Sequence, residues 1–399
     1  MSTATSSAAG APRRVLPTIV LAQFAGTSLW FAVNAVMPDL QRDWGLPASA
    51  VGTLTSAVQL GFIAGTLVFA LLTIADRHSP RLVFLLCALA GSGCNAAAVG
   101  LDRDFNALLA LRFATGFFLA GIYPVGMKIA AAWYSRGLGG ALGLLIGALV
   151  LGTAAPHGLR ALDAAWPWQS VMLGVSGLAL AGGVLLYLLV PDSPHLPRAA
   201  RIRPQALAVI WTDRRVRASA FGYFGHMWEL YAMWVLVPAI LAARIEMQQV
   251  PAAAFAVIGA GAIGCAAGGF AAARYGSARV AAVQLAASGL CCATAPLALA
   301  APLPVFALWL AVWGVTVAGD SPQFSTLTAQ NAPRDNVGSV LTFVNCIGFA
   351  ISIVTIQLFA WLAQRWPLWV VLPWLAIGPA LGLRMLRPLL ATRDAAAPR

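Results

Sequence analysis

Charged side chains are scarce in this chain of 399 residues, where they make up 10% of the sequence against 60% hydrophobic residues. Lysine occurs once, at Lys128, and glutamate twice, at Glu229 and Glu246. Soluble domains carry about 25% charged residues, so an ordinary soluble fold is excluded. The apolar residues form runs long enough to cross about 30 Å of hydrocarbon as helices of about 20 residues. The composition therefore indicates a multi-pass membrane protein.

Several signatures of catalysis and of cofactor binding are also absent. The chain has no G-x-x-x-x-G-K-[ST] segment, which argues against ATP-driven pumping. Neither H-E-x-x-H nor G-x-S-x-G occurs, which argues against an intramembrane enzyme. The six cysteines lie inside apolar runs without C-x-x-C spacing, so we expect neither disulfides nor a zinc site. We therefore expect no enzymatic activity, no metal and no cofactor.

A basic, proline-rich stretch divides the apolar runs into two sets of six. We expect an all-α membrane protein of twelve transmembrane helices, with a six-helix bundle in residues 1–190, a cytoplasmic linker in 191–217 and a second bundle in 218–399. The expected spans lie near residues 16–38, 51–74, 82–100, 106–130, 138–155, 168–190, 218–242, 252–273, 280–298, 304–330, 338–362 and 368–388.

The net charge of +12 has a membrane explanation that needs no nucleic acid as a partner. With an even number of spans, both termini and the linker share one side of the membrane. Most of the arginines then fall on that side, and positive residues gather in the cytoplasm. We expect a bacterial cytoplasmic (inner) membrane protein with both termini inside the cell, surrounded by lipid and acting as a monomer.

Two loops at corresponding positions of the halves indicate an internal repeat. LTIADRHSPR (Leu72–Arg81) follows the second span, and GFAAARYGSAR (Gly269–Arg279) follows the eighth. The first loop resembles the G-x-x-x-D-R-x-G-R-R signature of the major facilitator superfamily and keeps Asp76, Arg77 and Arg81. The chain departs from that signature at two positions where the family has glycine, Leu72 and Ser79, and the second copy lacks the aspartate.

This resemblance implies two pseudo-symmetric bundles in which helices 1, 4, 7 and 10 surround a central pathway. It also implies that Asp76, Arg77 and Arg81 form a charge-assisted lock that holds only when the cytoplasmic side is closed. The alternative is a solvated loop whose arginines follow the positive-inside rule.

Charges at membrane depth are rare and usually functional, because each costs about 2.5–3.5 kcal/mol at a helix centre. Arg112 and Gly116 in the fourth span are similar to the family's R-x-x-x-G motif, whose arginine is associated with proton coupling or with anionic substrates. Lys128 follows by sixteen residues and so lies on nearly the opposite face, unless Pro124 kinks the helix. Substrate contact is the functional interpretation of both cations, and snorkelling to the membrane surface is the alternative.

The seventh span carries Tyr223, His226 and Glu229 three residues apart, so they share a helix face. A carboxyl group removed from water holds a proton more readily, and histidine titrates near neutrality. We expect His226 and Glu229 to couple transport to protons and Tyr223 to contact substrate. A structural pairing of Glu229 with an arginine is the alternative.

In the tenth span, Asp320 precedes Pro322, which interrupts backbone hydrogen bonding, and interrupted helices mark transporter binding sites. We expect Asp320 to bind protons and Gln323 to contact substrate, with capping of the second half-helix as the alternative for Asp320.

The first span places four polar or aromatic residues on one helical stripe: Gln23, Thr27, Trp30 and Asn34. This stripe is a candidate cavity wall, and hydrogen bonding within a tight helix interface is the alternative.

Together these features predict a secondary active transporter that moves a small solute by alternating access. Similarity to bacterial nitrate/nitrite and cyanate porters, through LWFAVNAVMPDL and GIYPVGMK, favours proton-coupled import of a small anionic or polar solute. Proton-coupled efflux of drugs or metabolites is the alternative, although the helix-5 motif of drug antiporters is not met.

Overall fold

The structure is a computed structural model that describes residues 12–134, 138–163, 166–194 and 203–391. Within these residues all regular secondary structure is helical. Eleven described helices are long and apolar enough to cross a membrane, and Val15–Thr27 is a shorter apolar helix. The expected all-α membrane fold is confirmed. The part of the linker in residues 195–202 lies outside the described residues, as do Arg136 and the two chain ends.

The helices before the linker form the first bundle. Its elements are α1 (Val15–Thr27), α2 (Ala32–Ala35), α3 (Met37–Trp44), α4 (Ala50–Leu71), α5 (Ile74–Arg77), α6 (Pro80–Ala97), η1 (Ala98–Gly100), α7 (Phe105–Leu119), α8 (Tyr123–Trp133), α9 (Leu138–Leu162) and α10 (Trp168–Leu189).

The helices after the linker form the second bundle, and the short helix α11 (Ala206–Thr212) precedes it. Its elements are α12 (Arg214–Ala242), α13 (Val250–Gly259), α14 (Gly261–Tyr275), α15 (Ser277–Ala300), α16 (Leu303–Gly319), α17 (Ser321–Asn331), η2 (Arg334–Asn336), α18 (Val337–Ala363), α19 (Leu368–Val371), η3 (Leu372–Ala376) and α20 (Ile377–Ala391).

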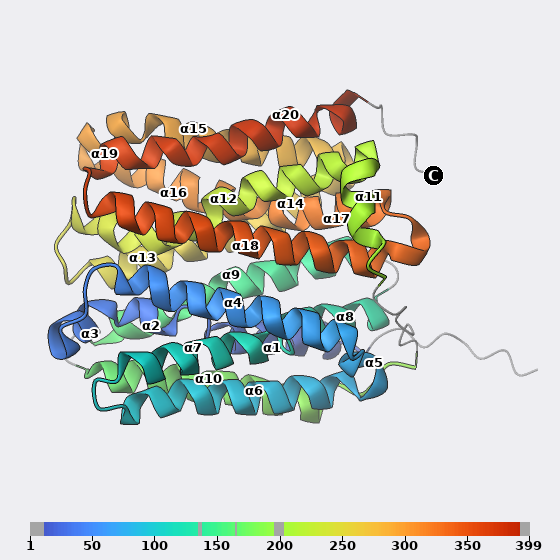
Figure 1. Cartoon of the computed structure of the whole chain (residues 1–399), viewed down its shortest axis with the longest axis horizontal. Helices are drawn as coiled ribbons and strands as arrows, with labels where there is room; N and C mark the ends of the chain where they lie inside the picture. Colours follow the sequence, from blue (N-terminus) through green and yellow to red (C-terminus); the bar gives the residue numbers. More distant parts are fainter. Residues whose placement is uncertain (1–11, 135–137, 164–165, 195–202, 392–399) are drawn as a thin grey trace, which may run out of the picture.

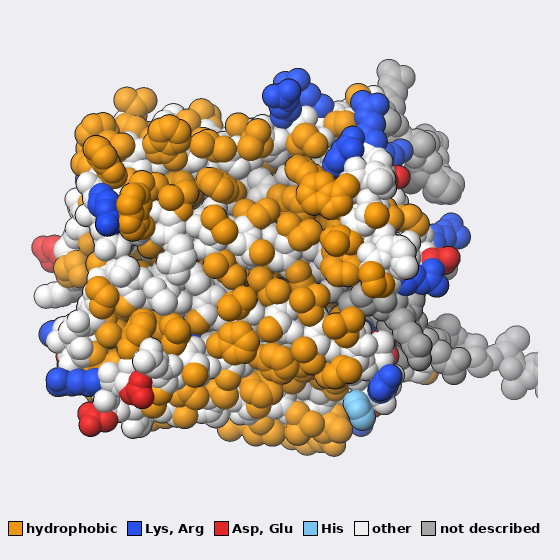
Figure 2. All heavy atoms as spheres, in the orientation of Figure 1, with side chains coloured by type: hydrophobic (Ala, Val, Ile, Leu, Met, Phe, Trp, Pro, Cys, Tyr) orange, Lys and Arg blue, Asp and Glu red, His pale blue; other side chains and the backbone are white. Residues whose placement is uncertain are grey.

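The long helices of both bundles run in nearly the same direction, and the two bundles lie side by side (Figure 1). We call the end that carries α5, α11 and the start of α1 the linker end, and the other the opposite end. Hydrophobic side chains cover the middle of the face drawn in Figure 2, whereas charged side chains gather toward the two ends. This pattern is typical of a protein whose middle section lies in the hydrocarbon core of a membrane.

Several spans are interrupted where the sequence places proline or glycine. The fourth span breaks between α7 and α8, where Pro124 occupies the first turn of α8. The tenth breaks at Asp320, with Pro322 in the first turn of α17, as expected from the sequence. Proline lacks a backbone N–H and suits the first turn of a helix, where that donor has no intrahelical acceptor.

The first span differs most from its prediction, because α1 ends at Thr27 and α2 begins only at Ala32. The seventh span begins earlier than expected, at Arg214. The side chain of Asp213 caps α12 by accepting hydrogen bonds from the backbone amides of Arg215 and Val216. Such a cap stabilises a helix start by satisfying orphan donors.

The two bundles meet in two regions of helix contact. In one, α9 packs on α13 and α14, where small residues allow close approach: a Cβ on Gly147 would lie 3.3 Å from the carbonyl oxygen of Ala262. In the other, α4 packs on α18, and hydrogen bonds join Ser352 to Gln59 at 3.1 Å and Gln357 to Ser56 at 3.0 Å. Small residues and polar contacts hold helices together in lipid, where apolar burial drives no association.

Glycine at position 116 is required by the contact of α7 with α4. A Cβ there would lie 2.0 Å from the carbonyl oxygen of Val58. Since backbone cannot yield as a flexible side chain does, we expect Gly116→Ala to lower the free energy of unfolding by about 1–3 kcal/mol. Thermal unfolding in detergent measures this change.

The matched control is Gly93→Ala in α6, because no described atom lies within 4 Å of a Cβ at that position. We expect this variant to unfold at the wild-type temperature or above it, since alanine favours helix over glycine. An equal loss of unfolding free energy in the two variants would contradict close packing at Gly116.

Candidate functional site

A cavity of about 500 Å³ lies between the two bundles. Its wall reaches exposed Gly139 and Gln330 near the linker end of α9 and α17, so the cavity opens toward that end. None of the described lining residues is charged. They come from α4, α8, α9, α12, α17 and α18 and include Tyr123, Met127, Tyr223, Phe324, Ser325 and Asn345. This wall suits a solute that offers an apolar face and a few hydrogen-bonding groups.

Two tyrosines and an asparagine mark the deep end of the cavity. Tyr123, Tyr223 and Asn345 line both the main cavity and a second, small pocket further inside. The hydroxyl of Tyr223 donates a hydrogen bond of 2.9 Å to the side-chain oxygen of Asn345, which ties α12 to α18. The structure therefore places Tyr223 in the cavity wall.

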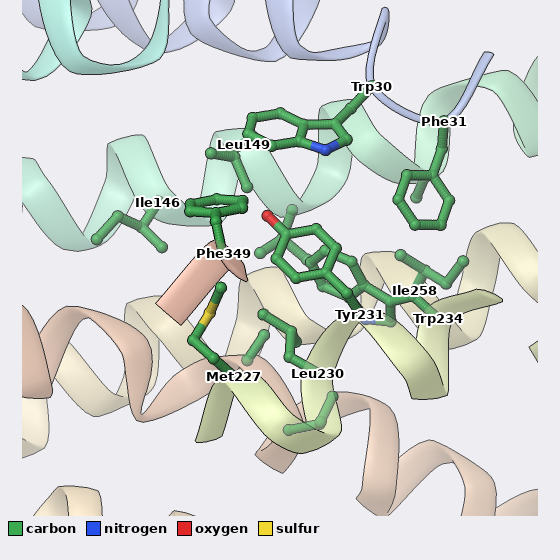
Figure 3. Packing of buried hydrophobic residues seen from close by; sticks show 14 of the residues in the cluster. Trp30, Phe31, Ile146, Leu149, Met227, Leu230, Tyr231, Trp234, Ile258 and Phe349 are labelled. Carbon is green, nitrogen blue, oxygen red and sulfur yellow. The ribbon is translucent and has the colours of Figure 1, made fainter. Parts of the chain in front are cut away.

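Aromatic side chains from both bundles close the pathway beyond this small pocket (Figure 3). The ring of Trp30 stacks on Phe349 at 5.5 Å and on Tyr231 at 6.0 Å between centroids, and Phe31 meets Trp234 edge-on at 6.1 Å. We call these five residues the aromatic seal. Aromatic rings bury large apolar areas and prefer such offset or edge-to-face pairs. The seal blocks the opposite end while the linker end stays open.

Arg112 lies behind this seal and stabilises the break in the first span. Its side chain is 1% exposed, and it donates hydrogen bonds to the carbonyl oxygens of Leu29 at 2.9 Å and Trp30 at 2.8 Å. A third bond reaches the side-chain oxygen of Asn95 at 3.0 Å. The guanidinium thus satisfies carbonyls that the end of α1 leaves without helical partners. Arg112 is not among the residues that line the described cavity.

The four residues of the first-span stripe do not form one continuous stripe, because the helix is interrupted after Thr27. Gln23 is fully buried next to Gly126 of α8. Thr27 packs against α9, and Asn34 donates a hydrogen bond of 2.8 Å to Thr55 of α4. Trp30 reaches Tyr231 and Phe349 of the second bundle, and none of the four lines the described cavity.

His226 pairs with Asp320 one layer behind the cavity wall. Nδ1 of His226 lies 2.7 Å from Oδ1 of Asp320, and the two side chains are 1% and 0% exposed. The histidine ring lies against the rings of Tyr223 and Phe324, which line the cavity. Asp320 makes no side-chain cap to α17, so the capping alternative is not observed. The pair is a buried, ionisable contact between α12 and the break in the tenth span.

Glu229 binds partners inside the second bundle. Its carboxylate accepts hydrogen bonds from Trp313 Nε1 at 2.6 Å, Ser288 Oγ at 2.9 Å and Cys292 Sγ at 3.2 Å. The partners described for Glu229 therefore include no arginine. Three donors from α15 and α16 hold this carboxylate in place, so it joins three helices of one bundle.

Gln323 is buried on α17 near Gly268 and does not line the described cavity.

Lys128 lies at the linker end, away from Arg112, and the two cations do not share a site. Its ammonium donates hydrogen bonds to the side chain of Asp76 and to the carbonyl oxygen of Ala75 at 2.7 Å. Both residues of the ion pair line a side pocket of about 240 Å³. Asp76 is thus held by the fourth span of its own bundle.

The arginines of the same loop behave differently. Arg81 contacts Asp192, at the end of the sixth span, with 3.2 Å between Nε and Oδ2, and it lies over the ring of Tyr187. Arg77 is exposed. The described contacts of Arg81 and Lys128 stay within the first half of the chain, so in this arrangement the loop is fastened to its own bundle.

Among the lining residues, helical periodicity predicted a role for Tyr223 but not for Tyr123 or Phe324. The signal for Tyr123 was its place beside Pro124, since interrupted helices line transporter cavities. Asn345 gives a weaker signal, because a lone amide in an apolar helix also suits a helix–helix hydrogen bond.

Comparison with known families gives a match to the family described as the Major Facilitator Superfamily over residues 19–356. The chain is similar to the gallate transporter of Pseudomonas putida, with 31% identity over 42% of this chain and 37% of that protein. It is also similar to the 4-hydroxybenzoate transporter PcaK of Pseudomonas aeruginosa, with 28% identity over 41% of this chain and 36% of that protein.

A third relative is the chloramphenicol resistance protein of Streptomyces lividans, 31% identical over 39% of this chain and 40% of that protein. The chain thus spans about two fifths of the curated relatives it matches. The likeness expected from the sequence was to nitrate, nitrite and cyanate porters, whereas these relatives are named for aromatic acids and a drug.

Solved structures show the same fold at low identity. The crystal structure of the human organic anion transporter MFSD10 matches with a TM-score of 0.71 and 16% identity over 94% of this chain and 99% of that chain. A bacterial homolog of the lysosomal transporter Spinster, inward-facing and unoccupied, matches with a TM-score of 0.68 and 14% identity over 94% of each chain.

The contacts of Arg112 predict a large stability loss when its side chain is removed. Arg112→Ala leaves two backbone carbonyls and the oxygen of Asn95 without these donors, so we expect a loss of about 2–4 kcal/mol in the free energy of unfolding. Thermal unfolding in detergent gives the change. Exposed Arg384 provides the control, since Arg384→Ala should alter stability by no more than about 0.5 kcal/mol. Similar, small changes in both variants would contradict the proposed support of the helix break.

Proposed function

Since the chain belongs to the Major Facilitator Superfamily and is a multi-pass membrane transporter, we propose that it carries a small anionic or polar solute by proton-coupled, alternating-access import. The cytoplasmic membrane of a bacterium is the proposed location, with the linker end facing the cytoplasm and the protein acting as a monomer. The three relatives are bacterial, and the arginine-rich linker end agrees with the positive-inside rule.

The observation that carries this proposal is the asymmetry of the pathway. A cavity of about 500 Å³ opens at the linker end, and the aromatic seal fills the opposite end between the same two bundles. An alternating transporter needs such a one-sided cavity, since a pathway open at both ends would be a channel. Separation of the seal and closure of the linker end would expose the same cavity to the other side.

The lining supports an aromatic, polar solute. Tyr123, Tyr223 and Phe324 offer ring faces, and Asn345 and Ser325 offer hydrogen bonds. The relatives named as gallate and 4-hydroxybenzoate transporters make aromatic acids the first solutes to test. In this proposal Gln23, Thr27 and Asn34 orient the first span behind Trp30. Gln323 and Arg112 contribute to solute binding indirectly or in other states of the cycle, and Lys128 contacts the solute.

Efflux of a drug or metabolite is the second candidate. The chloramphenicol resistance protein is a relative, and the uncharged lining also suits a neutral drug. The direction of solute movement under a proton gradient separates the two candidates.

The proposed proton site is the His226–Asp320 pair. Glu229, on the same helix as His226, is a second buried carboxylate. A buried pair gains or loses a proton at a large electrostatic cost, so protonation changes the contact between α12 and the tenth-span break. Tyr223 and Phe324 separate this pair from the cavity and could transmit such a change to the solute.

The loop with Asp76, Arg77 and Arg81 is the proposed lock of the closed linker end. Here that end is open, and Asp76 is held by Lys128 of its own bundle. Closure would bring the loop to the second bundle and give these charges new partners.

Uptake of 4-hydroxybenzoate and gallate into proteoliposomes, driven by a proton gradient, tests the transport proposal. We expect Asp320→Asn and His226→Gln to reduce gradient-driven uptake by about tenfold, a change equivalent to roughly 1.4 kcal/mol, while exchange of internal for external solute continues. The exposed Asp335 on η2 gives the matched control, and Asp335→Asn should transport as the wild type does.

The Glu229→Gln variant distinguishes two roles of Glu229: binding a transported proton, and joining α12 to α15 and α16 by hydrogen bonds. A proton role predicts lower gradient-driven uptake at unchanged thermal stability, which is the result we expect. Lower thermal stability together with an unchanged pH dependence of uptake would leave Glu229 only its role of joining the helices. Gradient-driven uptake that survives in all three variants would remove the proton proposal.

A further inference from the structure

The side pocket at the linker end lies directly beside the main cavity. Thr66, Pro124 and Thr342 line both spaces, so the pockets share a wall. The side pocket adds the apolar residues Phe69 and Val125 to the charged pair Lys128 and Asp76. Resting on the proposed import of an aromatic acid, we infer that this side pocket is the carboxylate subsite of the solute, where Lys128 exchanges Asp76 for the carboxylate of the bound acid.

The distribution of charge singles out Lys128. The described residues that line the main cavity and its small inner pocket include no cation. Arg112 is buried, and its guanidinium already binds two carbonyls and Asn95. An acid bound only in the main cavity would leave its carboxylate without a positive partner. Lys128 is the one cation among the described residues of the adjoining side pocket.

The geometry of α8 matches the two ends of such a solute. Tyr123 and Met127 face the main cavity, whereas Pro124 and Lys128, each one residue on, border the side pocket. Tyr123 and Lys128 are five residues apart, about 7.5 Å along the helix axis and about 140° around it. A hydroxybenzoate that occupied both adjoining spaces would place its ring hydroxyl near Tyr123, Tyr223 and Asn345 and its carboxylate near Lys128.

Exchange at Lys128 is feasible because the present pair is only partly buried. The side chains of Lys128 and Asp76 are 19% and 20% exposed, and pairs that stay near water contribute little to stability. An ammonium has three donors, so it can keep its bond to the carbonyl of Ala75 while one carboxylate replaces another. No unpaired charge is left buried, since the released Asp76 lies at the exposed edge of the protein.

The exchange links solute occupancy to the loop between α4 and α6. Asp76 follows Thr73, whose φ of 52° is a left-handed conformation that favours glycine and holds a β-branched residue under strain. Release of Asp76 by the solute removes one of the two hydrogen bonds by which Lys128 holds this loop. Thr342 of the second bundle borders both pockets, so a change at this ion pair takes place beside the contact between the bundles.

Binding of 4-hydroxybenzoate and of its neutral amide, 4-hydroxybenzamide, to the detergent-purified full chain tests this inference by calorimetry at constant ionic strength. The wild type should bind the acid about tenfold more tightly than the amide, and Lys128→Gln should bind both equally. Lys128→Arg should keep part of the preference. Asp76→Asn should bind the acid more tightly than the wild type and the amide with unchanged affinity, because the competing carboxylate is gone.

A folded Lys128→Gln protein that keeps the acid preference would overturn the inference, as would weaker acid binding by Asp76→Asn. The Asp76→Asn arm keeps the test decisive if Lys128→Gln does not fold. Equal binding of acid and amide by the wild type would overturn the subsite but leave the transport proposal in place. Binding of neither probe would overturn the subsite and remove aromatic acids from the proposed function.

Discussion

The arrangement of the molecule depends on the aromatic contact between its two bundles. Trp30 of the first bundle stacks on Phe349 and Tyr231 of the second, and this contact closes one end of the space between them. Because these rings meet through side-chain packing, the seal can separate without breaking any helix. The open cavity, its tyrosine-lined inner end and the exposed linker-end loop all follow from where the bundles touch and where they part.

The buried charged groups lie behind the pathway and not among the residues that line the described cavity. Arg112 satisfies the carbonyls at the break that carries Trp30, and the His226–Asp320 pair lies behind the cavity wall. Hydrocarbon offers no water to free backbone groups, so a break in a spanning helix requires such a partner. These charges therefore act on the pathway from one layer behind it, whereas Lys128 and Asp76 border a pocket that adjoins the cavity.

The fold was predictable from sequence because hydropathy and span length determine where helices cross a membrane, and eleven described helices meet those criteria. Helical periodicity also gave Tyr223, which lines the cavity. Helical periodicity did not predict the arrangement of the first-span residues, because the helix break after Thr27 changes the directions in which Trp30 and Asn34 point. The partners of Arg112 and Lys128 come from segments distant in the chain, so local spacing carries no information about them.

Distances between spin labels test the central claim most directly: the end that is open in this structure closes, and the sealed end opens, as solute is carried. Labels at exposed Asp102 and Gln248 span the bundles at the opposite end, and labels at exposed His78 and Asp335 span them at the linker end. In a variant lacking the natural cysteines, 4-hydroxybenzoate at acid pH should lengthen the first distance and shorten the second. Distances that stay fixed, or that change in the same direction, would contradict alternating access around the aromatic seal.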